Sequence, residues 1–254
     1  MYKVIKFLTI SAMMLSIANA QNIYATFTIE AQKSANLAFT STGIVQSVDV
    51  EVAERVHKGQ KLSQLDNSDL ASAVNIAKAD LENTKIKLKF AKRAYDRERK
   101  VKKLISEQQH DQVIQAYESA MSMIDIKEAT LAYKQSLLEK SILYAPFDGV
   151  IYDKQIEVGD AVSGAMIRTV LKIHSIDDVK LIVEFDQKYW KQVKLGQKFL
   201  YRVDGDKTKY EGKITKIYPY ADSNNRKIKA EVSTKGFMVG LFGDGYIITD
   251  SSER

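Results

Sequence analysis

Residues 67–140 constrain the fold most, because they contain neither glycine nor proline and are rich in charge. Apolar residues recur there in alternating steps of four and three, the spacing of a helix that packs along one seam. In the first half this seam comprises Leu70, Val74, Ala77, Leu81, Thr84, Leu88, Ala91 and Tyr95. In the second half it comprises Ile114, Tyr117, Met121, Ile124, Leu131 and Leu138, with Glu128 and Gln135 as polar exceptions. The two seams predict a long antiparallel helical hairpin.

The ends of both predicted helices carry capping signals. Asn67 or Ser68 can cap the first helix by accepting a backbone N–H bond. The first seam breaks around Lys102, and Ser106 with Gln109 reads as a capping box that starts the second helix. Each arm of about 33–36 residues would then reach about 50 Å. Such a hairpin could be a solvated spacer or a probe whose tip docks into another protein, and geometry alone does not separate these readings.

Two similar β-rich segments flank this helical stretch. The first contains Gly43–Val50 and Val56–Asp66, and the second runs from Gly149 to Val162. Gly59 and Gly159 occupy matching turn positions, and Asp148-Gly149 is a strong hairpin turn signal. Two halves that each expose an apolar face are expected to close on one another as a small sandwich or flattened barrel.

The segments after residue 177 also read as β-structure. About five or six strands are expected, with a short helix at 186–193. The strand segments are Val179–Phe185, Lys198–Val203, Tyr210–Tyr218, Arg226–Val232 and Gly245–Thr249. Their number and spacing predict a small antiparallel barrel. An earlier alternating segment, Ile23–Ile29, predicts one further strand.

The N-terminus has the order of a secretory signal. A short basic region up to Lys6 precedes the apolar run Phe7–Ile17 and then Ala18-Asn19-Ala20. The alternative is an uncleaved membrane anchor. The apolar run has about half of the roughly 20 residues that a spanning helix needs, so we favour a signal that is cleaved after Ala20 and directs export.

Composition restricts the chemistry that the chain can perform. The formal net charge is +6 with no cysteine, and no basic run is dense enough to indicate nucleic acid binding. His57, His110 and His174 are isolated in sequence, and no hydrolase or metalloprotease motif is present. Met121 and Met123 with His110 could suggest soft-metal binding, but core packing of Met121 is the stronger reading. We expect no enzymatic activity and no cofactor.

The ordered set of these segments carries a family resemblance. It comprises Gly43–Val45, Val56–Asp66, the helical insertion, Ile142–Val150, Val158–Val162, Val183–Phe185, Lys194–Gln197, Gly212–Ile217, Ala221–Arg226 and Leu241–Gly245. This set resembles the HlyD/membrane fusion protein family, the periplasmic adaptor subunits of tripartite efflux pumps. The resemblance covers about residues 40–250.

The resemblance implies an α+β fold that is mostly β. A biotinyl-lipoyl-like domain would be split by the hairpin and followed by a small β-barrel. The implied divisions are a signal peptide at 1–20, a first half-domain with an N-terminal strand at 21–66, the hairpin at 67–140, a second half-domain at 141–176, the barrel at 177–250 and a tail at 251–254. A membrane-proximal domain, common in adaptors of resistance-nodulation-division (RND) pumps, is expected to be absent or rudimentary.

The resemblance also implies contact residues. Family hairpin tips often carry an Arg, then a Leu, then a Ser, and this chain offers Arg97, Val101, Leu104 and Ser106, with the second interval two residues short. The turns of the lipoyl-like domain would use Gly43, Gly59, Asp148, Gly149 and Gly159, and the barrel Gly196, Arg226 and Gly243.

The implied function is that of an adaptor between an inner-membrane transporter and a TolC-like outer-membrane channel, self-associated into a ring. An RND-type partner is favoured and an ABC-type partner is possible, for export of drugs, bile salts or other toxic compounds. Alternatives are an adaptor of metal-ion efflux and a structural coiled-coil periplasmic protein. A biotin or lipoyl carrier is disfavoured, because the hairpin occupies the turn that would present the modified lysine.

Overall fold

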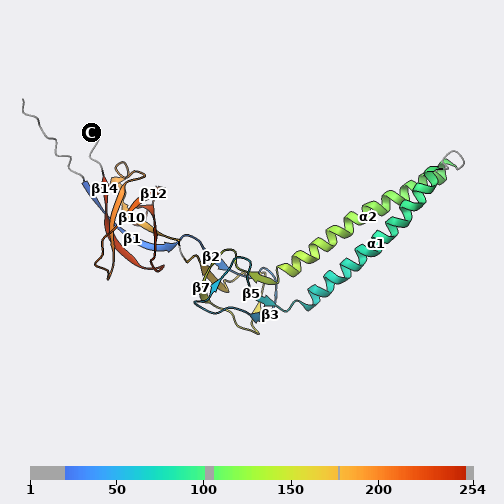
Figure 1. The fold of residues 1–254 in the computed structure, drawn as a ribbon, viewed down its shortest axis with the longest axis horizontal. Helices are drawn as coiled ribbons and strands as arrows, with labels where there is room; N and C mark the ends of the chain where they lie inside the picture. The colour runs from blue at the N-terminus through green and yellow to red at the C-terminus, as the bar shows by residue number, and fades with distance from the viewer. Residues whose placement is uncertain (1–20, 101–105, 177, 250–254) are drawn as a thin grey trace, which may run out of the picture. The chain divides into compact units, whose positions relative to one another are not determined.

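The computed structural model describes residues 21–100, 106–176 and 178–249 (Figure 1). The predicted signal peptide and the tip residues Val101 and Leu104 lie outside these ranges. The chain divides into two compact units, one formed by 21–32 with 178–249 and the other by 33–176. Within the described ranges, no helix combines the length and apolarity that a transmembrane span requires.

The first unit is a closed six-stranded antiparallel barrel. Its strands follow the order β1 (Gln21–Ala31), β10 (Asp178–Asp186), β13 (Lys227–Lys235), β12 (Tyr210–Ala221), β11 (Lys198–Val203) and β14 (Phe242–Thr249). A 3₁₀ turn, η2 (Gln187–Tyr189), follows β10 where a short helix was expected. The predicted barrel is confirmed, and alternate residues of its strands fill the interior.

Strand β1 corrects one expected boundary. The expected first half of the split domain spans residues 21–66, but β1 pairs with β10 and β14 and so closes the barrel. Ile23, Ala25, Phe27 and Ile29 alternate along β1 and are buried in the barrel core. The reason is that β1 pairs with two strands far from it in sequence. Without β1, the facing edges of β10 and β14 would be unpaired.

The second unit contains two four-stranded sheets. One has the order β2 (Ser34–Leu37), β9 (Leu171–His174), β7 (Gly149–Lys154) and β4 (Arg55–Val56). The other has the order β6 (Ile142–Tyr144), β5 (Lys61–Leu65), β3 (Gly43–Val48) and β8 (Ala161–Val162). Each sheet therefore takes strands from both sides of the helical insertion, and one buried cluster that includes Val45, Leu62, Ile151 and Ile173 joins them.

Matching turns of the two halves dock on each other. The backbone N–H of Gly59 donates to Ala145 O at 2.8 Å, and that of Gly159 donates to Val45 O at 2.9 Å. Both glycines have positive φ, 81° and 94°, a conformation that L side chains rarely adopt. Each half thus supplies a turn that hydrogen-bonds to the other half.

The hairpin consists of α1 (Ser68–Lys100) and α2 (Glu107–Glu139), which lie side by side (Figure 1). At its base Asp66 Oδ1 accepts from the backbone N–H of Ser68 at 3.2 Å, and the carbonyl of Asn67 accepts from the backbone N–H of Ala71 at 2.8 Å, where the helical hydrogen bonds begin. The Asn67 side chain instead donates to Ser141 Oγ at 3.0 Å, across the hairpin base. This bond ties the chain entering the hairpin to the chain leaving it.

The seam of α1 agrees with its prediction, but that of α2 does not throughout. Met121, Glu128 and Gln135 are exposed, whereas the half-buried positions are Ala120, Lys127 and Lys134. The inward face steps from Tyr117 by three residues to Ala120 and then by four to Ile124. Lysine fits this seam because its aliphatic stem covers apolar surface while its ammonium stays in water, and Lys127 Nζ reaches Asp80 Oδ2 at 2.9 Å.

Candidate docking site at the hairpin tip

The tip end of the hairpin is built from aromatic and polar layers. The rings of Tyr95 on α1 and Tyr117 on α2 stack with centroids 5.0 Å apart and an interplanar angle of 10°. This flat contact sets the spacing of the helices near the tip, and it agrees with the expectation that both tyrosines lie on the seam.

One layer closer to the tip, Glu98 on α1 faces His110 on α2. Their side chains are only 10% and 15% exposed, and Glu98 Oε1 lies 4.0 Å from His110 Nδ1. The apolar pattern of the sequence does not reveal this pair, because both side chains are polar. Glu98 lies three residues after Tyr95, and His110 lies four residues before Ile114, so both continue the seam spacing. That spacing is the sequence signal for this pair.

The predicted contact residues of the described tip have distinct placements. Arg97 is exposed on the last turn of α1, where a guanidinium can reach a partner. Ser106 caps α2, since its Oγ accepts from the backbone N–H of Gln109 at 3.3 Å, and the predicted cap is confirmed. The cap gives Ser106 a structural role that needs no partner.

The distal halves of the two helices carry opposite charge. Residues 85–100 of α1 hold the exposed cations Lys85, Lys87, Lys89, Lys92, Arg93, Arg97, Arg99 and Lys100. Residues 107–126 of α2 contain no lysine or arginine and hold the exposed carboxylates Glu107, Asp111, Glu118 and Asp125. The distal hairpin therefore presents a basic helix beside an acidic one.

The predicted turn residues of the second unit hold its halves together. Asp148 Oδ1 accepts from the backbone N–H of Lys58 at 2.8 Å, and so links the two halves. Gly149 lies against the carbonyl of His174, where a side chain would collide. Gly43 pairs with Val162 on β8, again across the halves. These contacts assign structural roles to these residues.

The predicted barrel residues have structural roles, in turns or at close packing contacts. Gly196 is a turn with φ of 83°, and Gly243 lies under the Phe27 ring with no room for a Cβ. Arg226 has φ of 57° and closes the turn before β13, with its N–H donating to Asp222 O at 2.8 Å. Arg226 and Gly243 line two separate shallow depressions, and Gly196 lines neither. The two depressions share Tyr24, Thr26 and Glu184.

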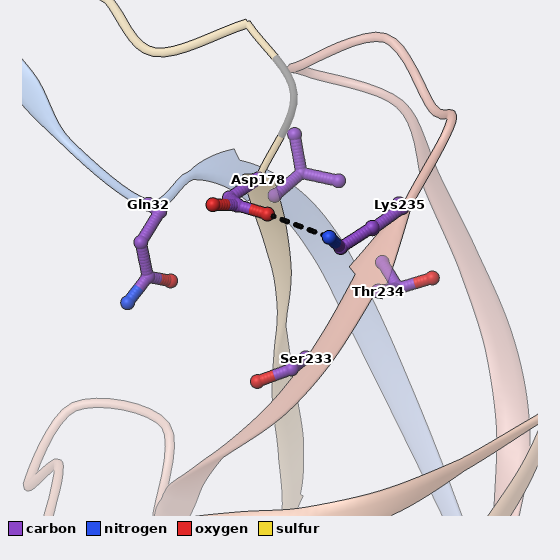
Figure 2. Close-up of a pocket in the computed structure, with 6 residues that line it drawn as sticks. Gln32, Asp178, Ser233, Thr234 and Lys235 are labelled. Atoms are coloured by element: carbon purple, nitrogen blue, oxygen red, sulfur yellow. Dashed lines mark ion pairs between the residues drawn. The ribbon is translucent and has the colours of Figure 1, made fainter.

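A further depression at one end of the barrel is polar and open (Figure 2). Its volume is about 330 Å³, and it is lined by Gln32, Asp178, Val179, Ser233, Thr234 and Lys235. The one ion pair drawn there joins Asp178 Oδ1 and Lys235 Nζ at 3.3 Å, between side chains that are well exposed. Nothing in this depression gathers the reactive groups that a catalytic site requires.

The barrel wall contains a buried carboxylate with a full set of partners. Glu231 accepts from Tyr218 Oη at 2.7 Å and pairs with Lys180 and Lys216, each at 3.1 Å. Burial alone would raise the pKa of Glu231, but these hydrogen bonds and cations outweigh it and hold the pKa below the usual range. The bond to Glu231 is the main cause that raises the pKa of Tyr218 to about 12.

Metal ligands are not gathered in the described parts of the chain. Within 21–100, 106–176 and 178–249, no three or more side chains of His, Cys, Asp or Glu come together as a metal site would need. Met121 and Met123 lie on the exposed surface of α2, 47% and 42% exposed, so the expected core packing of Met121 is wrong.

Comparison with known proteins places this architecture in a family. Residues 33–171 match the model of the CzcB-like barrel-sandwich hybrid domain. The chain is 24% identical over 208 residues to the cobalt-zinc-cadmium resistance protein CzcB of Cupriavidus metallidurans, covering 79% of this chain and 39% of that protein. It is 24% identical to the multidrug resistance protein MdtA of Proteus mirabilis over 180 residues, covering 70% of this chain and 44% of that protein.

A solved structure shares the fold. The crystal structure of MacA from Actinobacillus actinomycetemcomitans superposes with a TM-score of 0.79 at 19% identity, covering 91% of this chain and 79% of MacA. The family match spans more than half of the chain, so this protein is one of the class that contains a barrel-sandwich hybrid domain. The chain belongs to the CzcB-like family of membrane fusion proteins. It spans about two fifths of the length of the curated relatives named above.

Proposed function

We propose that the chain is a periplasmic adaptor that links an inner-membrane efflux transporter to a TolC-like outer-membrane channel. The observation that carries the proposal is the hairpin, two helices of 33 residues each inserted between strands that complete shared sheets. Within the described residues, the extensive contacts of α1 are with α2. A hairpin packed mainly on itself leaves its outer surface free for partners, and Arg97 is exposed at its end.

Self-association into a ring is part of the proposal. The basic distal half of α1 and the acidic distal half of α2 are complementary, so α1 of one copy can pack beside α2 of the next. A head-to-tail contact of this kind generates closed rings when its rotation closes. Exposed charge pairs steer and orient association more than they strengthen it, so sedimentation should show self-association that weakens with salt.

Export of drugs, bile salts or other toxic compounds is the proposed activity, with an RND-type transporter favoured and an ABC-type transporter as the alternative partner. The similarity to MdtA, named for multidrug resistance, supports this choice. The signal peptide proposed at 1–20 would place the mature chain in the periplasm.

Metal-ion efflux is a second candidate. The family match and the similarity to CzcB, named for cobalt, zinc and cadmium resistance, favour it. Tolerance of a deletion strain separates the candidates, because sensitivity to these metals alone would support metal efflux, and sensitivity to drugs and bile salts would support multidrug efflux. Unchanged tolerance to all of them would support the structural coiled-coil alternative.

Charge reversal at the tip tests the docking step. Arg97→Asp should lower tolerance to the level of the deletion strain while leaving folding and expression unchanged. Lys78→Asp makes the same change at an exposed position in the base half of α1 and should leave tolerance unchanged. Normal tolerance in the Arg97→Asp strain would overturn docking through this residue.

A further inference from the structure

The polar layer formed by Glu98 and His110 contains two buried atoms without hydrogen-bond partners. Glu98 Oε1 and His110 Nδ1 are both buried, and neither has a hydrogen-bond partner. Their separation of 4.0 Å exceeds hydrogen-bonding distance. A buried polar atom without a partner is unfavourable, because it has lost its bonds to water without replacement.

A proton on the imidazole removes this defect. A neutral imidazole carries its hydrogen on one ring nitrogen, whereas an imidazolium donates from both. Protonated His110 therefore always presents an N–H to Glu98, and the two groups attract as opposite charges in a poorly solvated layer. A small closure of the two helices brings Nδ1 and Oε1 within bonding distance.

The surroundings of the pair favour such a response. The neighbouring layer on the base side is the Tyr95–Tyr117 stack, which excludes water from that side. Only α1 and α2 among the described elements pack against the pair. Their other charged groups near it are exposed and therefore screened by water, namely Asp96, Arg97, Arg99, Lys100, Glu107 and Asp111.

We propose that Glu98 and His110 form a proton-operated clamp that fastens α1 to α2 beside the tip. The clamp closes when His110 takes up a proton and loosens when His110 loses it. The clamp would change how Arg97 and Ser106 are positioned for a partner, and this consequence rests on the proposed function. The clamp itself is a property of the hairpin alone.

Hydrogen exchange of the full chain at about pH 5.5 and about pH 7.5 tests the clamp. After correction for intrinsic exchange, amides of 91–100 and 107–117 should be more protected at the lower pH by on the order of tenfold, the size of one charge-assisted hydrogen bond. Glu98→Gln and His110→Gln should each abolish this difference. His57→Gln should retain it, because His57 lies 3.6 Å from Asp148 in an exposed pair of the same type.

Two further outcomes keep the test decisive. A double variant, Glu98→Leu with His110→Leu, fills the layer with apolar side chains and should be protected equally at both pH values. Equal protection of the wild-type tip at both pH values, or a pH difference that survives in both glutamine variants, would overturn the clamp. Neither result changes the expected effect of Arg97→Asp on tolerance, so failure of the clamp and failure of the adaptor role are distinguishable.

Discussion

The barrel and the hairpin bury their side chains to very different extents. Strands of the barrel place residues such as Phe27, Val183 and Phe199 in an interior with at most a few percent exposure. In the hairpin, no residue of α2 is as fully buried as a core residue, and the buried residues of α1 are Ala77, Leu81, Thr84 and Glu98. The barrel thus has a core of its own, whereas the hairpin has a single seam and a large free surface.

Each region also contains one buried glutamate, and the two differ in their partners. Glu231 in the barrel has three partners that keep it ionised, whereas Glu98 in the hairpin faces His110 without a hydrogen bond. A buried carboxylate with all its hydrogen-bond partners stabilises one conformation. A buried carboxylate without a partner leaves the packing around it open to change when a partner becomes available. This contrast agrees with the proposal that the hairpin, and not the barrel interior, responds to a partner.

The largest effect should come from removing a barrel core ring. Phe199 is fully buried and packs edge-to-face with Phe27 at 5.9 Å. Phe199→Ala should lower the free energy of unfolding of the barrel by about 3–5 kcal/mol, measured by denaturant unfolding. Phe90→Ala, at an exposed hairpin position, is the control and should change it little. Similar losses in both variants would erase the contrast between the regions.

In the hairpin, the matching truncation should cost less. Leu81 is 6% exposed on the seam of α1, so Leu81→Ala should destabilise the hairpin by about 2 kcal/mol, the low end for a core leucine. Hydrogen exchange should quicken in α1 and α2 and stay unchanged in the barrel strands. Quickened exchange throughout the barrel would show that the two units unfold together.

The partners of Glu231 predict a pH dependence of barrel stability. Its folded pKa lies below its unfolded value, so its stabilisation is present above the unfolded pKa and is lost as the pH falls through the folded pKa. Glu231→Gln should cost about 1–2 kcal/mol near neutral pH and should flatten the decline of the unfolding free energy below about pH 5. An unchanged acid limb in the variant would contradict the assigned partners.

The smallest effect is expected at the cap of α2. Ser106→Ala removes the oxygen that accepts from Gln109 N, and loss of a serine cap costs about 1 kcal/mol. The first turn of α2 should exchange faster, while Ser106→Asp should preserve protection because a carboxylate also caps. Loss of protection in both variants would show that the hydroxyl has another role.

The sequence predicted most elements that depend on local pattern. The α1 seam from Leu70 to Tyr95, the cap at Ser106 and the turns at Gly59 and Gly159 all follow from spacing and residue type. The place of β1 could not be predicted in this way, because alternation shows a strand but not its partners, and β10 lies far along the chain. The α2 register was partly wrong because half-buried Lys127 and Lys134 read as surface residues.

At the candidate site, the sequence indicated exposed Arg97 but not the Glu98–His110 layer. Polar residues at seam positions read as breaks in a pattern of apolar residues, and only the structure shows that they face each other. The sequence signal for this layer is that the seam keeps its alternating steps of three and four residues. It is easy to overlook because the residues at these two positions are polar.

The central claim is that the hairpin tip contacts an outer-membrane channel. A photo-crosslinking amino acid placed at Arg97 of the full chain in living cells tests it most directly, with the same amino acid at Lys78 as the control. We expect a crosslink to an outer-membrane protein from position 97 and none from position 78. No such crosslink from position 97, or equal crosslinks from both positions, would contradict it.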